Sequence, residues 1–373
     1  MILSTRTLTP YLLDRGLVAP AEVVDGDLLI ADMTRRNRNF RVRRGAGRPG
    51  LFVKQPQDWE PHSAETLRRE ATCYLLARDD ADFAALGELL PRFVDYDTNS
   101  SVLALELLPS DESMGDYHRR LGTFPTEIAD RVGTMLGSYH RHAGNRTRDA
   151  GRDAAFPRGI PWILHAVHHN PAHVGAVSGG NQELVRILTR YPEYARALDG
   201  IRDGWRRDAL IHGDLKWENC MVLPPETEDG PPGMRIIDWE MADFGDPCWD
   251  VGSIFQAYLC FWILSIQAAD TAPPERLPSL AQVPLERMQP AMRTFWEAYA
   301  RTLGADEAEM ADRLRRSAQY TAARMIQTAW EHTAYVPQLN ANILCIMQVA
   351  MNILLRPDEA VRTLLGIQTA VPA

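Results

Sequence analysis

Residues 210–219, LIHGDLKWEN, contain the residue types that transfer of a phosphoryl group requires. An apolar lead-in gives way to a polar loop, in which Asn219 stands five residues after Asp214. A carboxylate in such a loop can accept or orient the proton of an attacking hydroxyl, and an amide oxygen can bind Mg²⁺. The run therefore predicts a catalytic loop in which Asp214 is the catalytic aspartate.

Two other segments supply the remaining parts of such a site. Asp238 ends the short apolar run IID, where its carboxylate can bind a hard cation. Lys54 lies inside the strand-like LFVKQ, and an inward-pointing lysine is costly unless it meets anions such as the α- and β-phosphates of ATP. Glu70, in the helical segment that follows, is placed to pair with Lys54, and Glu65 is the competing partner.

Each of these residues taken alone has an ordinary explanation. An Asp after Gly is usually a turn former, a Lys in a strand usually faces water at an edge, and a Glu in a helix is usually solvated. The ordered set is much harder to obtain by chance, because a strand Lys, a helix Glu, HGD-x4-N and an apolar pair before Asp follow one another along one chain.

Hydrophobic periodicity predicts the elements that must position these residues. The first hundred or so residues have the pattern strand, strand, strand, helix, strand, strand, with the helix over 63–78. The rest is mostly helical, interrupted by two short strands within 221–240. We therefore expect an α+β chain with a nucleotide-binding lobe over 1–108 and a helical lobe over 109–373 that holds the catalytic loop, the metal site and the acceptor site.

Composition narrows the class of protein. The chain has 373 residues and a formal net charge of -9, which argues against a general nucleic-acid binder. Its five cysteines include no CxxC pair, so a disulfide framework is not expected and a reducing cytoplasm fits best. The uncharged run 251–269 is long enough to suggest a membrane span, but we expect a helix buried inside a lobe and no membrane partner.

Five segments together resemble the aminoglycoside phosphotransferase and choline kinase group, which is similar in fold to protein kinases. HGDLKWEN resembles the catalytic loop of the group, IIDWE stands where protein kinases have DFG, and GDPCWDVGSIF resembles the GDP-x-x-D-h segment. TRRNRNFRV resembles the phosphate-covering hairpin, and SVLALELLP resembles the strand that enters the adenine-binding hinge. The resemblance covers roughly residues 5–270.

The resemblance implies a bilobal protein-kinase-like fold, ATP and Mg²⁺ as cofactors, and an alcohol hydroxyl as the acceptor of the γ-phosphoryl group. It also implies a role for each matching position: Asp214 as catalytic base or orienting group, Asn219 and Asp238 as Mg²⁺ ligands, Lys54 on the phosphates with Glu70 holding it, the backbone around Glu106 to Leu108 at the adenine, and Asp250 as a brace for the catalytic loop.

The chain departs from the pattern of the group at two places. The hairpin TRRNRNF lacks glycines, so the phosphates would be met by Asn37, Asn39, arginines or nearby amides. Many small-molecule members have His two residues after the catalytic Asp, whereas this chain has Lys216, as in the HRDLKPEN of Ser/Thr protein kinases. A lysine there can contact the transferring γ-phosphoryl group, which mildly favours a peptide hydroxyl; drift within a small-molecule family is the other explanation.

Three hypotheses remain for function. The first is a small-molecule kinase for an antibiotic, amino alcohol or sugar. The second is a Ser/Thr kinase acting on a ribosomal precursor peptide before elimination, because RNRNF and GLFVKQ resemble kinase-like proteins of lanthipeptide or thioamitide biosynthesis. The third, and least favoured, is a pseudokinase that binds nucleotide or a biosynthetic partner enzyme. The acceptor, a preference for ATP or GTP, and the oligomeric state are left open.

Several other polar groups have a functional and an ordinary interpretation. A zinc site is conceivable at the histidines of HAVHHNPAH, but we prefer a polar helix and turn near the acceptor, with His168 or His169 touching substrate. The arginines of 35–44 form a solvated strand face or a dock for phosphates or an acidic leader peptide. Asp243 and Asp246 lie where an acceptor would approach. The histidines in question are His165, His168, His169 and His173.

Overall fold

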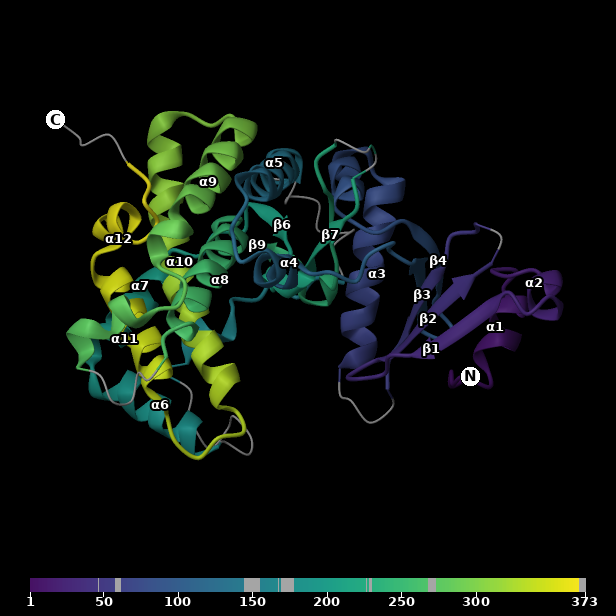
Figure 1. Cartoon of the computed structure of the whole chain (residues 1–373), viewed down its shortest axis with the longest axis horizontal. Coiled ribbons are helices and arrows are strands. Elements are labelled where there is room, and N and C mark those ends of the chain that lie inside the picture. The colour runs from purple at the N-terminus through teal and green to yellow at the C-terminus, as the bar shows by residue number, and fades with distance from the viewer. Residues whose placement is uncertain are drawn as a thin grey trace. The chain divides into compact units, whose positions relative to one another are not determined.

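The computed structural model forms two compact units, which we describe separately (Figure 1). One consists mainly of residues 1–114 and 218–242, and the other mainly of 115–143, 157–217 and 243–368. The boundary between the units falls inside the predicted catalytic loop, between Trp217 and Glu218. The structure describes residues 1–45, 47–57, 62–143, 155–166, 168, 178–225, 227, 230–267 and 273–368.

The first unit is built on a five-stranded antiparallel sheet in the order β1-β2-β3-β5-β4. Helix α3 (Ser63–Asp79) lies between β3 and β4 in the sequence, so the predicted succession of strands and helix is confirmed. The strands are β1 (Leu28–Asp32), β2 (Arg38–Arg44), β3 (Leu51–Gln55), β4 (Phe93–Asp97) and β5 (Val102–Glu106).

An N-terminal segment covers one face of this sheet. Leu8 and Leu12 of helix α1 (Leu8–Asp14) belong to one buried cluster with Val42 and Val53 of the strands. Successive side chains of a strand point to opposite faces, so Lys54, next to Val53, faces the other way. The packing of the first helices therefore fixes which side of the sheet carries the lysine.

A second β element completes the first unit. Strands β7 (Cys220–Leu223) and β8 (Gly233–Ile236) pair in antiparallel register, with Cys220 opposite Ile236, as the sequence predicts. The amide of Ile237 donates to the carbonyl of Asn219 at 2.9 Å. The pairing therefore brings Asn219 beside the residue that precedes Asp238.

The arginine run of the first unit is largely used within that unit. Arg44 donates to Glu22 at 2.7 Å, Arg36 donates to Glu240 at 2.8 Å, and Arg41 pairs with Asp111. The run is therefore more than a solvated strand face, because three of its guanidinium groups tie the sheet to other parts of the unit.

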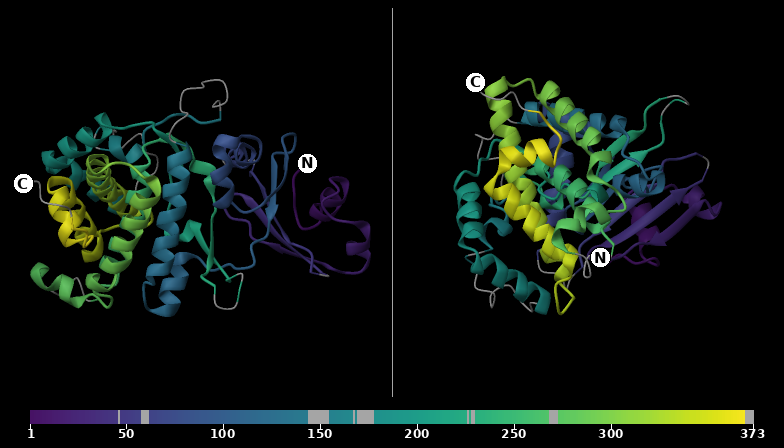
Figure 2. Two further views of the ribbon diagram at one scale, coloured as in Figure 1. Left: turned by 90° about the horizontal axis from the view of Figure 1, so that it is seen from above. Right: turned by 60° about the vertical axis from the view of Figure 1, so that its left-hand side comes forward.

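The second unit is mainly helical. Gly133 lets α5 lie against α9, since a Cβ there would come within 2.3 Å of the carbonyl oxygen of Phe295. Figures 1 and 2 show the C-terminal helices, in light green to yellow, gathered together. The α-helices from residue 114 onward are α4 (Met114–Leu121), α5 (Thr126–Ala143), α6 (Gly179–Arg190), α7 (Pro192–Asp203), α8 (Cys248–Leu264), α9 (Gln289–Leu303), α10 (Glu307–Thr333), α11 (Ala341–Leu355) and α12 (Pro357–Thr363).

Three expectations for this unit have clear outcomes. The apolar run forms α8, which is almost wholly buried, as predicted, and no helix among the described residues is both long and apolar enough to cross a membrane. The chain beyond the first unit is mostly helical, as predicted, and within it α6 and α7 are separated at Pro192, which cannot continue the hydrogen-bond ladder of a helix. The small sheet of β6 (Ala209–Ile211) and β9 (Asp243–Gly245) was not predicted.

The Glu22–Arg44 pair predicts a pH dependence of stability. Hydrogen bonds from Arg44 lower the pKa of the Glu22 carboxyl to about 2, so its stabilising contribution is complete above the ordinary Glu value and is lost as the pH falls toward 2. We expect Glu22→Gln to reduce the loss of unfolding free energy between pH 5.5 and pH 3, measured by urea titration. Exposed Glu65→Gln is the control, and an unchanged pH dependence in Glu22→Gln would contradict the assignment.

Candidate active site

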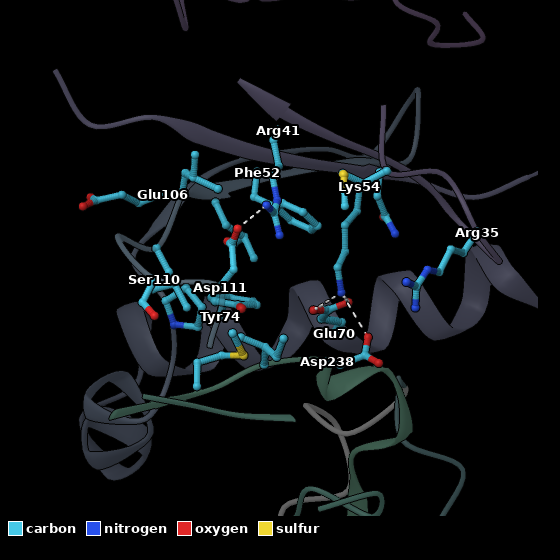
Figure 3. Close-up of a pocket in the computed structure, with 18 residues that line it drawn as sticks. Arg35, Arg41, Phe52, Lys54, Glu70, Tyr74, Glu106, Ser110, Asp111 and Asp238 are labelled. Atoms are coloured by element: carbon cyan, nitrogen blue, oxygen red, sulfur yellow. Dashed lines mark hydrogen bonds and ion pairs between the residues drawn. The ribbon is translucent and has the colours of Figure 1, made fainter. Parts of the chain in front are cut away.

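The first unit contains a cavity of about 370 Å³ (Figure 3). Its wall combines an apolar end with a charged end, which is the usual character of a site for a small ligand. Phe52 and Tyr74 lie toward the more apolar end, which also carries the Arg41–Asp111 ion pair, whereas Lys54 and Asp238 mark the charged end. An elongated ligand with a flat ring and an anionic tail suits this division.

Lys54 is the centre of the charged end. It is 7% exposed, and its Nζ donates to both oxygens of Glu70 at 2.9 Å and to Oδ1 of Asp238 at 3.1 Å. Burial would lower the pKa of Lys54, but the two carboxylates outweigh it and raise the pKa. The partner is Glu70, from α3; Glu65 is exposed and lies 3.4 Å from His62 instead.

Asp238 and Asn219 are the two residues of this unit that the sequence predicts as metal ligands. Asp238 has a half-exposed side chain and a left-handed backbone, with φ 67° and ψ 53°. Asn219 is buried at the start of the strand paired with β8. One carboxylate and one amide oxygen fit Mg²⁺, which usually takes its remaining ligands from phosphates and water. Among the described residues there is no cluster of three or more His, Cys, Asp or Glu that could hold a metal ion.

The segment after β5 borders the apolar end of the cavity. The amides of Glu106 and Leu107 already donate to the carbonyls of Arg92 and Gly50, each at 2.9 Å. Leu108 also lines the cavity, and within the described part of the chain its amide has no hydrogen bond. Of these three amides, that of Leu108 is therefore the one available to a ligand.

The hairpin between β1 and β2 borders the charged end. Arg35 and Asn39 line the cavity, and Figure 3 shows the Arg35 guanidinium directed toward Lys54 and Asp238. Asn37 is buried behind them, 6% exposed. Arg36, next to Arg35, donates to Glu240, whose main-chain oxygen accepts from Arg69 of α3 at 3.2 Å. The side chain of Arg36 thus ties the hairpin, which contains no glycine, to Glu240.

The second unit holds Asp214 in a braced loop. The amides of His212 and Gly213 donate to the two oxygens of Asp250 at 2.7 and 3.1 Å, and Trp249 Nε1 donates to the Gly213 carbonyl at 2.9 Å. Gly213 has φ 79°, a left-handed conformation that favours glycine. The geometry of Asp250 is that of the expected brace.

Two cations contact Asp214. Lys216 Nζ lies 2.9 Å from its Oδ2, and Arg324 Nη2 of α10 lies 2.9 Å from its Oδ1. Burial would raise the pKa of Asp214, but the positive charges outweigh it and lower the pKa. Sequence reasoning did not find Arg324. The only signal was a charged residue within the small and apolar stretch TAARMIQTA, and nothing in that stretch names its partner.

Trp217, Asp246 and Asp243 of this unit have contacts within the fold. Trp217 is 2% exposed and packs on His118 and Tyr258, so the packing interpretation holds. The expectation that Asp246 faces an acceptor is wrong, because it is fully buried with Arg316 and Tyr320. Asp243 accepts hydrogen bonds from main-chain amides of residues 158 and 159.

The histidine segment is described only in part. His168 Nε2 lies 2.6 Å from Asp199 Oδ1, and His165 belongs to a short 3₁₀ turn. His169 and His173 lie outside the described residues. Substrate contact by this segment therefore stays a prediction.

Comparison with known proteins defines the class. A model of the phosphotransferase enzyme family matches residues 31–272, and the chain belongs to this family. It is accordingly an enzyme that transfers phosphate to an alcohol group. No curated protein sequence matches the chain significantly.

Solved structures share the bilobal kinase-like fold. An ethanolamine kinase of Plasmodium vivax superposes with a TM-score of 0.55 at 12% identity, over 96% of this chain and 90% of that one. A choline kinase of Cryptosporidium parvum gives 0.54 at 12%, over 96% of each chain. A microcompartment-associated aminopropanol kinase gives 0.52 at 16%, over 98% and 99%. The predicted fold class is confirmed.

The brace on the catalytic loop generates a stability prediction. In Asp250→Asn an amide NH₂ would replace one of the oxygens that accept the His212 and Gly213 amides, leaving a buried donor unsatisfied at a cost of about 1–3 kcal/mol. We expect a lower thermal unfolding temperature than in the wild type. Asp116→Asn, an exposed ion-pair residue of α4, is the matched control. Equal unfolding temperatures for the two variants would contradict the bracing role.

Proposed function

We propose that the protein is an ATP- and Mg²⁺-dependent kinase that moves the γ-phosphoryl group to the hydroxyl of a small molecule. The observation that carries this proposal is the buried ammonium of Lys54, which is paired with Glu70 and Asp238. It lines a cavity whose apolar and charged residues suit a nucleotide. Lys54 would hold the α- and β-phosphates, and Glu70 would fix its direction. The apolar end, with the Leu108 amide, would take the adenine.

The metal would be held by Asn219 and Asp238. When bound there, Mg²⁺ neutralises charge that develops on the phosphate oxygens. In the absence of the metal, Lys54 contacts one oxygen of Asp238. The Asp238 side chain is 38% exposed, so a cation that arrives with the nucleotide would reach it from solvent.

Asp214 would orient the acceptor. The acceptor oxygen forms a bond to the γ-phosphorus as the bond from that phosphorus to the β–γ bridging oxygen breaks, and ADP leaves. The hydroxyl proton is directed to the Asp214 carboxylate or to water. No covalent enzyme intermediate is required. Because its two cationic neighbours lower the pKa of Asp214, it is ionised at neutral pH and suited to orienting the hydroxyl.

A small-molecule acceptor is supported by family membership and by the likeness in fold to kinases of ethanolamine, choline and aminopropanol. The second candidate acceptor is a Ser or Thr of a precursor peptide. It is favoured by Lys216, which contacts Asp214 and stands where Ser/Thr protein kinases carry a lysine; such a lysine would contact the transferring phosphoryl group. The complete set of polar residues counts against a pseudokinase.

The hairpin generates a prediction about nucleotide binding. Arg35 and Arg43 are both exposed arginines of this hairpin, but only Arg35 lines the cavity. We expect Arg35→Met to weaken Mg-ATP binding about 5- to 10-fold by calorimetry, the size of one charge-assisted hydrogen bond, and to leave adenosine binding unchanged. Arg43→Met should bind both ligands as the wild type does. Equal losses in the two variants would remove Arg35 from the phosphate site.

The acceptor and the catalytic roles are tested together by mass spectrometry. The protein is incubated with Mg-ATP and a panel of amino alcohols, aminoglycosides, sugars and Ser- or Thr-containing peptides, and addition of one phosphoryl group is recorded. We expect transfer to a small alcohol and a loss of about 10²- to 10⁴-fold in Asp214→Asn. Asn219→Ala should raise the Mg²⁺ concentration needed. Transfer to peptides alone would favour the second candidate; nucleotide binding without transfer to any acceptor would contradict both.

A further inference from the structure

Arg324 is a buried arginine that the proposed chemistry does not by itself require. Its side chain is 4% exposed, and its Nη2 donates to Oδ1 of Asp214 at 2.9 Å. Removing a guanidinium from water is costly unless an anion meets it. The cost is offset here by the one carboxylate that would face the acceptor hydroxyl, so the pairing joins α10 directly to the reacting centre.

The surroundings of Arg324 hold it in one place. Helix α10 lies tightly on α8, since a Cβ on Gly252 would come within 2.7 Å of the Ser317 carbonyl oxygen, and Thr321 Oγ1 donates to the Gly252 carbonyl at 3.1 Å. The guanidinium carbon lies 5.6 Å from the ring centroid of Trp249, the residue of α8 that also donates to Gly213. Arg324 therefore lacks the freedom of a residue that swings onto a substrate.

Lys216 offers a contrast on the other oxygen of Asp214. It comes from the same loop as Asp214, and its side chain is 39% exposed against 4% for Arg324. A half-exposed lysine can leave Asp214 for an incoming phosphoryl group at little cost, whereas a buried arginine cannot. The two cations are thus suited to different tasks, one mobile and one fixed.

We propose that Arg324 is a positioning residue for Asp214: its guanidinium fixes the direction of the carboxylate while Lys216 turns to the transferring phosphoryl group. The proposal rests on the proposed role of Asp214 toward the acceptor hydroxyl. It assigns to α10, which lies about a hundred residues after the catalytic loop, a direct part in setting the reacting geometry.

Charged and titratable groups face Asp214 from α10 and from its own loop. Arg324 faces it from α10, and Lys216 and His212 face it from its own loop. Glu331, two turns after Arg324 on α10, raises the pKa of Lys216 and so supports that cation and not Asp214 itself. Removing Arg324 therefore leaves Lys216 as the main cation against the effect of burial, and the pKa of Asp214 should rise.

The test follows the Asp214 carboxyl by ¹³C NMR, with its resonance assigned by Asp214→Asn, and the intrinsic hydrolysis of Mg-ATP in the same variants. In Arg324→Gln we expect the Asp214 pKa to rise above that of the wild type, because burial is then opposed mainly by Lys216. We expect hydrolysis to fall about 10- to 100-fold, more steeply toward pH 5.5, with an unchanged dissociation constant for Mg-ATP. Arg324→Lys should keep the titration close to that of the wild type and restore part of the rate.

Arg315→Gln is the matched control, since Arg315 is an exposed arginine of the same helix, 57% exposed. It should leave both the titration and the rate unchanged. A folded Arg324→Gln with the titration and rate of the wild type would overturn the proposal. If Arg324→Gln does not fold, the Arg324→Lys variant is used to test the proposal. A hydrolysis rate equal to that of the wild type, with only a lower unfolding temperature, would show that the role of Arg324 is structural. A wild type that neither hydrolyses nor transfers phosphate rejects the proposed function, while the titration still tests the pairing.

Discussion

The buried ammonium of Lys54 is the constraint on which the first unit depends. A positive charge removed from water needs opposite charges within hydrogen-bond distance, and here they come from α3 and from the residue after β8. The sheet, the helix and the short hairpin of β7 and β8 must therefore keep their mutual positions. The N-terminal segment packs on the opposite face of the sheet and buries Val53 there. With Val53 held on that face, its neighbour Lys54 is kept on the face that carries the cavity.

In the second unit, buried carboxylates likewise have hydrogen-bond donors as partners. Asp250 is a fully buried anion that takes two main-chain amides, and Asp246 is another that takes Arg316 and Tyr320. Both stand at or near the start of α8, a strongly apolar helix of the unit. The carboxylate that holds the catalytic loop thus belongs to a buried, apolar helix, where little water competes for its hydrogen bonds.

Much of the architecture could be predicted from sequence because its causes are local. The period of two over β1 to β3, the helix over α3 and the spacing HGD-x4-N are each contained in a short window, and Lys54 and Glu70 follow from the burial cost of a charge. Arg324 could not be found, since its partner lies 110 positions away. The acidic cluster after Asp238 was misread for the related reason that a sequence does not show which carboxylates are buried. Asp246 is the example.

The left-handed backbone of Asp238 has a consequence for how this position can evolve. Glycine, asparagine and aspartate are the residues that enter that conformation most readily, while a side chain such as that of glutamate meets a penalty of about 1–2 kcal/mol. Of the three, only aspartate carries a negative charge. The substitution usually regarded as conservative is therefore unfavourable, and the permissive ones remove the charge. Of the standard residues, aspartate is thus the one that combines a negative charge with ready access to this backbone conformation.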